Sequence, residues 1–455
     1  MKHKSTKYVS NTVIKNVCVL LIFLCFSNGQ ETLQLKQADS LSSKNINNES
    51  VTVLKGNIIF KKDSKLLFGD KAIQSNSSGV VQLSENVSIK DDDMTIFCDS
   101  LSYNSDNGNI DLIGNVKIVD LKQSISANTG KIINNENKMI LKDNCEIIDQ
   151  NQKIVGDLFE ISFENKSIKS LQVLENGIIF SSNDGFEKEN EIKTPVNNID
   201  ILKAKTIRID LKNDDDSKIE LIEMASSLIH LYQDSLYQGI NEVSGDKIII
   251  NIENKNATTL TSSGGVIGKF IPSKSNTSNQ QKINYKGEIV EFDTRANQSK
   301  MFGKANLYQE GIDLTASQIN INWDNNILEA FDENPFDKDE KFQPILIENK
   351  REPITGKSIV YNIKNRTGKV IGGSTSVQNN MYMGSQITSV TDSTFYIDDC
   401  IFTSCDPSKF YLGSKQVKII YGDKVIAKPL NIVIGGVPIF GIPMAIFPHS
   451  SDERR

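Results

Sequence analysis

Short alternations of apolar and polar residues recur along the chain at an interval of 29 residues. Four asparagines each open such an alternation, at Asn57, Asn86, Asn115 and Asn144. A second series keeps the same interval, at Asp70, Asp99, Asn128 and Asp157. A fixed period of this length is typical of proteins in which one supersecondary unit is stacked repeatedly. We therefore expect a stack of similar units and not a single globular core.

Each 29-residue unit contains two alternations that predict β-strands. In the third unit, the segments 113–119 and 124–133 have this pattern, and polar clusters at 120–123 and 134–137 predict turns. Strands of this length with turns of three to five residues match ordinary β-proteins. No stretch of the chain shows sustained helical periodicity, so we predict an all-β fold.

The apolar residues of the repeats predict a continuous stripe on one face of the stack, because side chains alternate between the two faces of a strand. With Cys145, the stripe comprises Ile58, Phe60, Val87, Ile89, Val116, Ile118, Ile147, Ile178 and Phe180. Two structures are compatible with it: the sealed core of a sandwich, or the lining of an open apolar groove. The recurrence of Val, Ile and Phe, without recurring acids or aromatic platforms, argues against a carbohydrate-binding or adhesive β-helix.

The first 29 residues have the pattern of a secretory signal peptide. Four lysines precede the ten-residue apolar core 17–26, which is too short to span a bilayer, and small residues follow it. Subtracting these four lysines from the 51 basic residues leaves 47, against 57 acidic residues. The remaining chain is therefore acidic, which argues against nucleic acid as a partner.

The residues that commonly carry chemistry form no recognisable constellation. Cys98, Cys145, Cys400 and Cys405 remain after signal removal, and Cys400 and Cys405 are close enough in sequence to bridge a turn as a disulfide. The histidines His230 and His449 lack ligand spacing, and the aspartate runs 91–93 and 214–216 are typical of solvated turns. We expect no enzymatic activity, no metal site and no cofactor.

The end of the chain differs from the repeats. Residues 430–447 are uncharged and mostly apolar, but Gly435, Gly436, Pro438, Gly441 and Pro443 argue against a membrane helix. The pattern predicts a strand, a turn and a second strand.

This tail resembles the LptD (OstA) family of lipopolysaccharide-assembly outer-membrane proteins. The order Thr403-Ser404-Cys405-Asp406, Val437-Pro438, Pro443, Phe447-Pro448 and Arg454-Arg455 follows a run found in that family. The repeats, with phrases such as Gly114-Asn115-Val116, are similar to its periplasmic domain, an elongated, twisted β-jellyroll. Family members continue into a transmembrane β-barrel, whereas this sequence stops at Arg455. We expect an incomplete sequence, with a protein that naturally lacks the barrel as the alternative.

The resemblance and the sequence pattern together give a domain plan. We predict a signal peptide at 1–29, a flexible lead at 30–50, a β-jellyroll at 51–395 that is regular to 185 and irregular from 186, and a transition segment at 396–455.

The resemblance also implies a function. The stripe would line an apolar groove that binds the acyl chains of lipopolysaccharide, which then pass to the outer leaflet of the outer membrane. Implied partners are lipopolysaccharide, other β-jellyroll bridge proteins joined end to end, and an outer-membrane lipoprotein if the barrel exists. The implied location is the periplasmic side of the outer membrane, or the periplasm if the chain ends at Arg455. A soluble bridge protein of the same pathway is the alternative, and a carbohydrate-binding β-helix is a second one.

Overall fold

The structure of the protein is a computed structural model. It describes residues 33–448, except for 47–48, 92–93, 121–122, 150, 165–166, 190–191, 214, 234, 255, 274–280, 334, 337–341, 350, 378–379, 392 and 404–409. The predicted signal peptide lies outside the described residues. Within them the structure has thirty β-strands, one 3-10 helix (η1, Asn134–Glu136) and no α-helix. The all-β prediction is confirmed.

The chain divides into two compact units. The N-terminal unit comprises Ser10–Tyr237 and Ser244–Thr259, and the C-terminal unit contains Gln238–Val243 and Leu260–Arg455. The division falls inside the range 51–395, which the sequence pattern assigns to one jellyroll.

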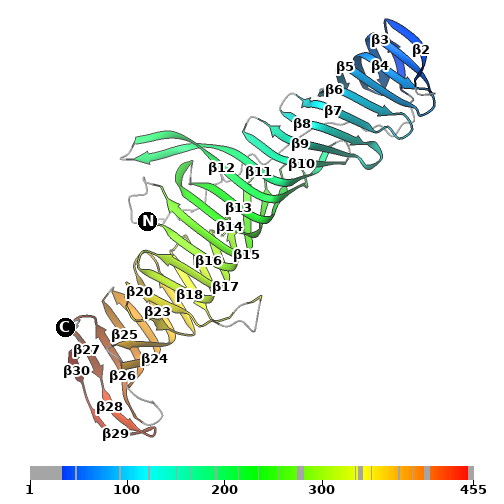
Figure 1. Ribbon diagram of the computed structural model, residues 1–455. Helices are drawn as coiled ribbons and strands as arrows, with labels where there is room; N and C mark the ends of the chain where they lie inside the picture. The colour runs from blue at the N-terminus through cyan, green and yellow to red at the C-terminus, as the bar shows by residue number, and fades with distance from the viewer. Residues whose placement is uncertain are drawn as a thin grey trace, which may run out of the picture. The chain divides into compact units, whose positions relative to one another are not determined.

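The strands of the N-terminal unit are β1 (Gln34–Gln37), β2 (Ser40–Ile46), β3 (Glu49–Lys62), β4 (Lys65–Ser75), β5 (Val80–Asp91), β6 (Met94–Asn104), β7 (Ile110–Val119), β8 (Ser124–Ile133), β9 (Lys138–Ile148), β10 (Gln152–Glu164), β11 (Ser167–Glu189), β12 (Ile192–Leu211) and β13 (Ser217–Gln233). Two further strands, β14 (Leu236–Glu253) and β15 (Asn256–Pro272), have residues in both units. From β3 to β13 each strand pairs antiparallel with the next in sequence (Figure 1).

A backbone corner divides each odd-numbered strand from β3 to β11 in two. At each corner two consecutive residues have left-handed backbone angles; Gly114 and Asn115 of β7, for example, have φ values of 76° and 47°. The pairing register shifts at these points, for example between Ile113 and Val116. Asparagine tolerates left-handed angles better than most residues, which explains the 29-residue asparagine series. Its members Asn57, Asn86, Asn115 and Asn144 all have positive φ, as does Asn176.

The second sequence series lies beside the first. Asn86 Nδ2 donates to Asp70 Oδ2 at 2.5 Å, and Asn115 Nδ2 donates to Asp99 Oδ2 at 2.9 Å. The same bond joins Asn57 to Asp39 and Asn176 to Asp157. In β5 and β7 the two periodic series therefore meet in one hydrogen bond, and Asp39 and Asn176, which lie outside the 29-residue intervals, take part in the same bond at the corners of β3 and β11.

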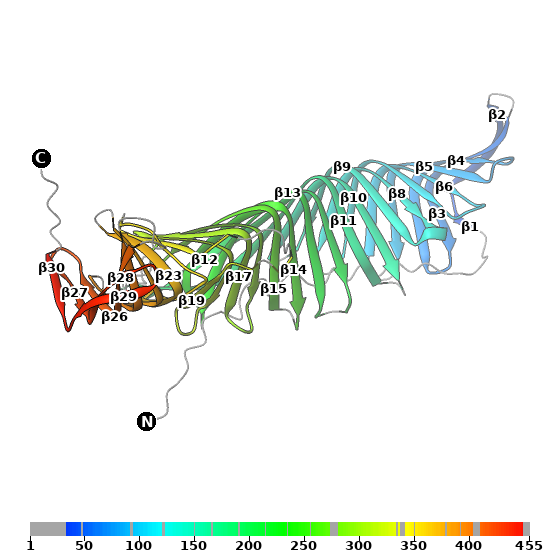
Figure 2. The same ribbon diagram turned by 90° about the horizontal axis from the view of Figure 1, so that it is seen from below.

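The two halves of each strand bury alternate side chains in one shared interior. In β5, Val81 and Leu83 are buried before the corner, and Val87 and Ile89 are buried after it. The strands arch from one edge of the unit to the other, so that the halves form two walls (Figure 2). We call the buried apolar side chains between these walls in β3–β10 the apolar interior.

The predicted flexible lead at 30–50 requires a correction, because β1 and β2 occupy most of its described part. β1 pairs with the second half of β3 and β2 with the first half, and Asp39 between them meets the corner at Asn57. Their described side chains are largely exposed. Backbone hydrogen bonds along the edge of β3 hold these two strands. Because their side chains need not be buried, the sequence of β1 and β2 shows no apolar alternation that would predict strands.

The C-terminal unit continues with β16 (Ile283–Asp293), β17 (Gln298–Gln309), β18 (Ile312–Asn322), β19 (Ile327–Phe331), β20 (Ile345–Glu348), β21 (Ile354–Thr355), β22 (Ser358–Asn362), β23 (Thr367–Val377), β24 (Asn380–Thr391), β25 (Thr394–Thr403), β26 (Phe410–Ile420), β27 (Lys424–Lys428), β28 (Leu430–Ile434), β29 (Val437–Ile442) and β30 (Ala445–Pro448). Here some strands are interrupted: the two ends of β18 pair separately with β19 and β20, and those of β26 with β27 and β28. The tail forms the predicted strand–turn–strand at β28 and β29. Within the described residues, no helix combines the length and apolar character needed to cross a membrane.

The corner geometry leads to a prediction about stability. Replacing Asn115 by valine should lower the free energy of unfolding by about 2 kcal/mol, because a β-branched residue disfavours the left-handed angle and the bond to Asp99 is lost. Replacing Asn115 by glycine keeps the angle accessible and should cost no more than about 1 kcal/mol. Urea unfolding followed by circular dichroism measures both. Equal losses in the two variants would contradict a role for the backbone angle.

Candidate functional site

Seven of the nine residues predicted for the apolar stripe lie in the apolar interior. Each is no more than 3% exposed: Ile58, Phe60, Val87, Ile89, Val116, Ile118 and Ile147. Cys145 joins them at 2%. The predicted stripe residues lie on odd-numbered strands, and buried residues of the even-numbered strands lie between them. Leu67, for example, pairs with Phe60 on one side and with Ile89 on the other. The stripe is therefore continuous along β3–β9.

Ile178 and Phe180 do not belong to this buried row, which corrects the sequence prediction. Both are partly exposed, whereas Ile179 between them is buried. The buried face begins directly after the corner asparagine in each odd-numbered strand. In β11 the residue after Asn176 is Gly177, so the inward positions shift by one relative to the predicted alignment. A one-residue shift exchanges the two faces of a strand.

The even-numbered strands supply further residues of the apolar interior, which sequence reasoning missed. They include Leu67, Ile96, Leu101, Tyr103, Ile125 and Ile161, all buried. In β6 the buried positions are Met94, Ile96 and Cys98, followed by Leu101 and Tyr103. Buried residues therefore have even numbers before Asp99 and odd numbers after it. The aspartate series marks that change, and this signal was present in the sequence.

Two cysteines line the apolar interior. Burial raises the pKa of the Cys98 thiol to about 11 and that of Cys145 to about 12. These two cysteines and the buried Cys400 of the C-terminal unit form no disulfide with another described cysteine, and burial raises the pKa of the Cys400 thiol to about 12. Cys405 lies outside the described residues, so the Cys400–Cys405 disulfide stays a prediction.

The mouth of the apolar interior is the line where the two edges of the strand stack meet. Edge A is formed by the ends of β4, β6 and β8, and edge B by the ends of β3, β5 and β7. Within edge B, Ser64 Oγ donates to Asp91 Oδ1 at 2.7 Å. From edge B to edge A, Lys62 Nζ donates to the hydroxyl of Tyr103 at 2.8 Å and lies 5.4 Å from the centre of its ring. This contact closes the mouth between β3 and β6.

A buried polar cluster lies where β11 and β12 extend as a long hairpin (Figure 1). Asp200 accepts hydrogen bonds from Asn183 Nδ2 at 2.7 Å and from the His230 backbone N–H at 2.7 Å. The His230 ring Nδ1 lies 2.9 Å from the same carboxylate. The sequence offered no acid near His230, since its partner is 30 residues away. All three side chains are at most 8% exposed, and they anchor the base of the hairpin.

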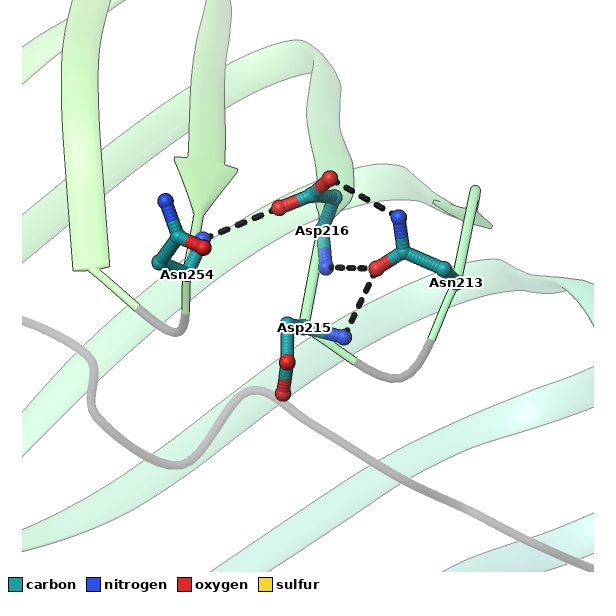
Figure 3. A pocket seen from close by; sticks show the side chains of 4 residues that line it. All are labelled: Asn213, Asp215, Asp216 and Asn254. Carbon is teal, nitrogen blue, oxygen red and sulfur yellow. Dashed lines mark hydrogen bonds between the residues drawn. The ribbon is translucent and has the colours of Figure 1, made fainter.

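Asp215 and Asp216 of the aspartate run line a shallow polar pocket of about 390 Å³ (Figure 3), and Asp214 lies outside the described residues. Asp216 accepts from the Asn254 backbone N–H at 2.9 Å and from Asn213 Nδ2 at 2.8 Å. These bonds, led by that from Asn254, lower the pKa of Asp216. The carboxylate thus joins two turns. Among the described residues, no group of three or more His, Cys, Asp or Glu could hold a metal ion.

Comparison with known proteins shows that the first strands are similar to a family model. Residues 30–124 match the family model of the OstA-like protein. The matched residues include β1–β7 and the corners at Asn57, Asn86 and Asn115, and the same corner geometry continues beyond them at Asn144 and Asn176.

Two further comparisons add less. A solved structure similar to part of the chain is described as that of LptH, the LptA homologous periplasmic component of the conserved lipopolysaccharide transport device from Pseudomonas aeruginosa. The identity is 14%, the match covers 28% of this chain and 81% of that one, and the TM-score is 0.19, which is too low to carry an argument. A search of curated proteins found no match.

The cysteines of the apolar interior lead to a prediction about pH. A thiol reacts with alkylating agents as the thiolate, and a raised pKa keeps the thiol protonated until the pH approaches that value. Cys98 and Cys145 should therefore resist iodoacetamide at pH 8 and react increasingly towards pH 11. Mass spectrometry of the modified peptides measures this, with the protein in urea as the control. Rapid modification of Cys145 at pH 8 in the folded protein would show that the interior is open to water.

Proposed function

We propose that the apolar interior of the N-terminal unit carries the acyl chains of lipopolysaccharide between its two walls. The observation that carries this proposal is the continuous row of Val, Ile and Phe side chains, which runs along the strand stack and is interrupted by no charge. Each methylene of an acyl chain taken from water gains about 0.8 kcal/mol, so a lipid with several chains needs a long apolar surface. The match of residues 30–124 to the OstA-like family supports lipopolysaccharide as the ligand.

The apolar interior is packed in this structure, so lipid binding requires the walls to part. The corner hydrogen bonds on one side and the mouth on the other suggest how this happens. The corners would keep the walls joined, while the contact that joins the two edges of the mouth among the described residues is that of Lys62 with Tyr103. Acyl chains would enter through the mouth, and the sugars and phosphates would stay in water outside it.

The exposed edge of β1 and β2 supports a second part of the proposal. Each pairs with β3, and in the described part of the chain neither has a strand on its other side. Such an edge offers backbone donors and acceptors to another β-stack. We propose that a bridge protein of similar fold docks there and extends the apolar interior. Delivery to the outer membrane, with an outer-membrane lipoprotein as partner, is the finer form of this proposal, and a periplasmic bridge is the alternative.

A pair of substitutions on β7 tests the lipid proposal. Ile118 is 2% exposed and faces the interior, whereas Ile113 on the same strand is 52% exposed. Replacing Ile118 by aspartate should weaken lipopolysaccharide binding at least about tenfold, because a charge replaces an apolar contact. The matched variant Ile113→Asp should bind as the wild type does. Titration with fluorescently labelled lipopolysaccharide measures the affinity.

Aspartate in the interior also threatens the fold, so a milder variant completes the test. Val116→Thr has nearly the same shape and adds one hydroxyl to the row. It should stay folded by circular dichroism and bind lipid several-fold more weakly. Unchanged binding by folded Val116→Thr and Ile118→Asp proteins would show that the interior is a sealed core. Binding of the polysaccharide after its acyl chains are removed would favour a carbohydrate-binding protein.

A further inference from the structure

The contact between Lys62 and Tyr103 joins edge B to edge A, whereas Lys90 at the end of β5 lies 5.4 Å from the ring of Phe68 on the adjacent strand β4. Lys65 lies 3.9 Å from the carboxylate of Asp91 and so has an acidic partner. The contacts found for Lys62 are instead with a neutral phenol: the 2.8 Å hydrogen bond and the position over the ring. Lys62 is also partly buried, whereas its neighbour Lys61 is exposed. The ammonium group of Lys62 is thus held at the mouth by neutral groups.

Tyr103 connects this contact to the apolar interior. Its side chain is only 3% exposed, so the ring belongs to the interior, while its hydroxyl reaches the mouth. The loop after β6 also comes near the ammonium group, because a Cβ added at Gly108 would lie 3.3 Å from Lys62 Nζ. Acyl chains that part the walls between β3 and β6 must therefore separate Lys62 from Tyr103.

We propose that Lys62 and Tyr103 form a latch across the mouth, and that a phosphate group on the lipid headgroup opens it by replacing Tyr103 as the partner of Lys62. This inference rests on the proposed function and names the chemical group of the lipid that the mouth would recognise. A neutral hydrogen bond with a cation–π contact is weaker than an ammonium–phosphate pair. When the acyl chains lie between the walls, the headgroup lies at the mouth, within reach of the freed ammonium group. Lys62 thus selects phosphorylated lipids.

Three variants separate the latch from the headgroup contact. Tyr103→Phe removes the hydroxyl and keeps the buried ring. Lys62→Met removes the charge and keeps most of the side-chain length. Lys61→Met removes a charge from the same strand on the exposed side and is the matched control. The full chain is titrated with the acylated disaccharide of lipopolysaccharide in detergent micelles, either with both phosphates or after enzymatic removal of the phosphates.

The affinities and rates give distinct expected results. The wild type and Lys61→Met should bind the phosphorylated lipid about tenfold more tightly than the dephosphorylated one, as expected for one charge-assisted contact. Lys62→Met should bind both lipids equally. Tyr103→Phe should keep the preference and load lipid about fivefold faster, because one hydrogen bond no longer holds the mouth closed.

The outcomes that overturn the latch differ from those that overturn the lipid function. If the wild type binds neither lipid, the proposed function fails. If it binds both lipids and Lys62→Met keeps the wild-type preference, the function stands and the latch is wrong. Inorganic phosphate at millimolar concentration should leave lipid binding unchanged. Displacement of the lipid by phosphate alone would assign Lys62 to a free anion and overturn the role of the headgroup.

Discussion

The hydrogen bond between a corner asparagine and an aspartate of the neighbouring strand is the constraint on which the N-terminal unit depends. A strand of ten or more residues would otherwise run straight and leave one face in water. In the odd-numbered strands two left-handed residues make this turn, and in β5 and β7 the asparagine amide at the turn is held by the carboxylate of the neighbouring strand. Because these turns recur at matching positions from β3 to β11, one row of corners produces two walls.

The burial pattern follows from this corner. In each half-strand, side chains point alternately into the interior and out to solvent. After the corner, the apolar side chains of the second half again point into the interior. Both walls therefore direct Val, Ile, Leu and Phe to the same side, and no charged residue is needed there. Among the described residues of the opposite side, the edges are joined by the contact of Lys62 with Tyr103, which does not recur from strand to strand as the corner bond does. In the proposed function this difference makes the corners a hinge and the opposite side a mouth.

Polar groups outside the apolar interior hold the structure of the N-terminal unit in place, both in a buried cluster and at the surface. Asp200 joins the hairpin of β11 and β12 to β13 through Asn183 and His230, and Asp216 joins two turns. Each carboxylate accepts several hydrogen bonds, which is how a protein tolerates a charge away from bulk water or fixes a turn. These clusters shape the unit but do not enter the row of apolar side chains.

The sequence by itself determined the all-β class, the 29-residue unit and most of the buried row, because side-chain alternation and left-handed asparagines leave a local, periodic record. It also indicated the strand, turn and strand near the end of the chain. Three features were decided only by the tertiary structure. β1 and β2 are held by backbone bonds to β3, which have no side-chain signature. The inward face of β11 depends on where its corner lies, and Gly177 displaces it by one residue. The contacts of Lys62 with Tyr103 and of Asp200 with His230 join residues that are 41 and 30 positions apart in the sequence. No local sequence pattern shows that such distant residues meet, because only folding brings them together.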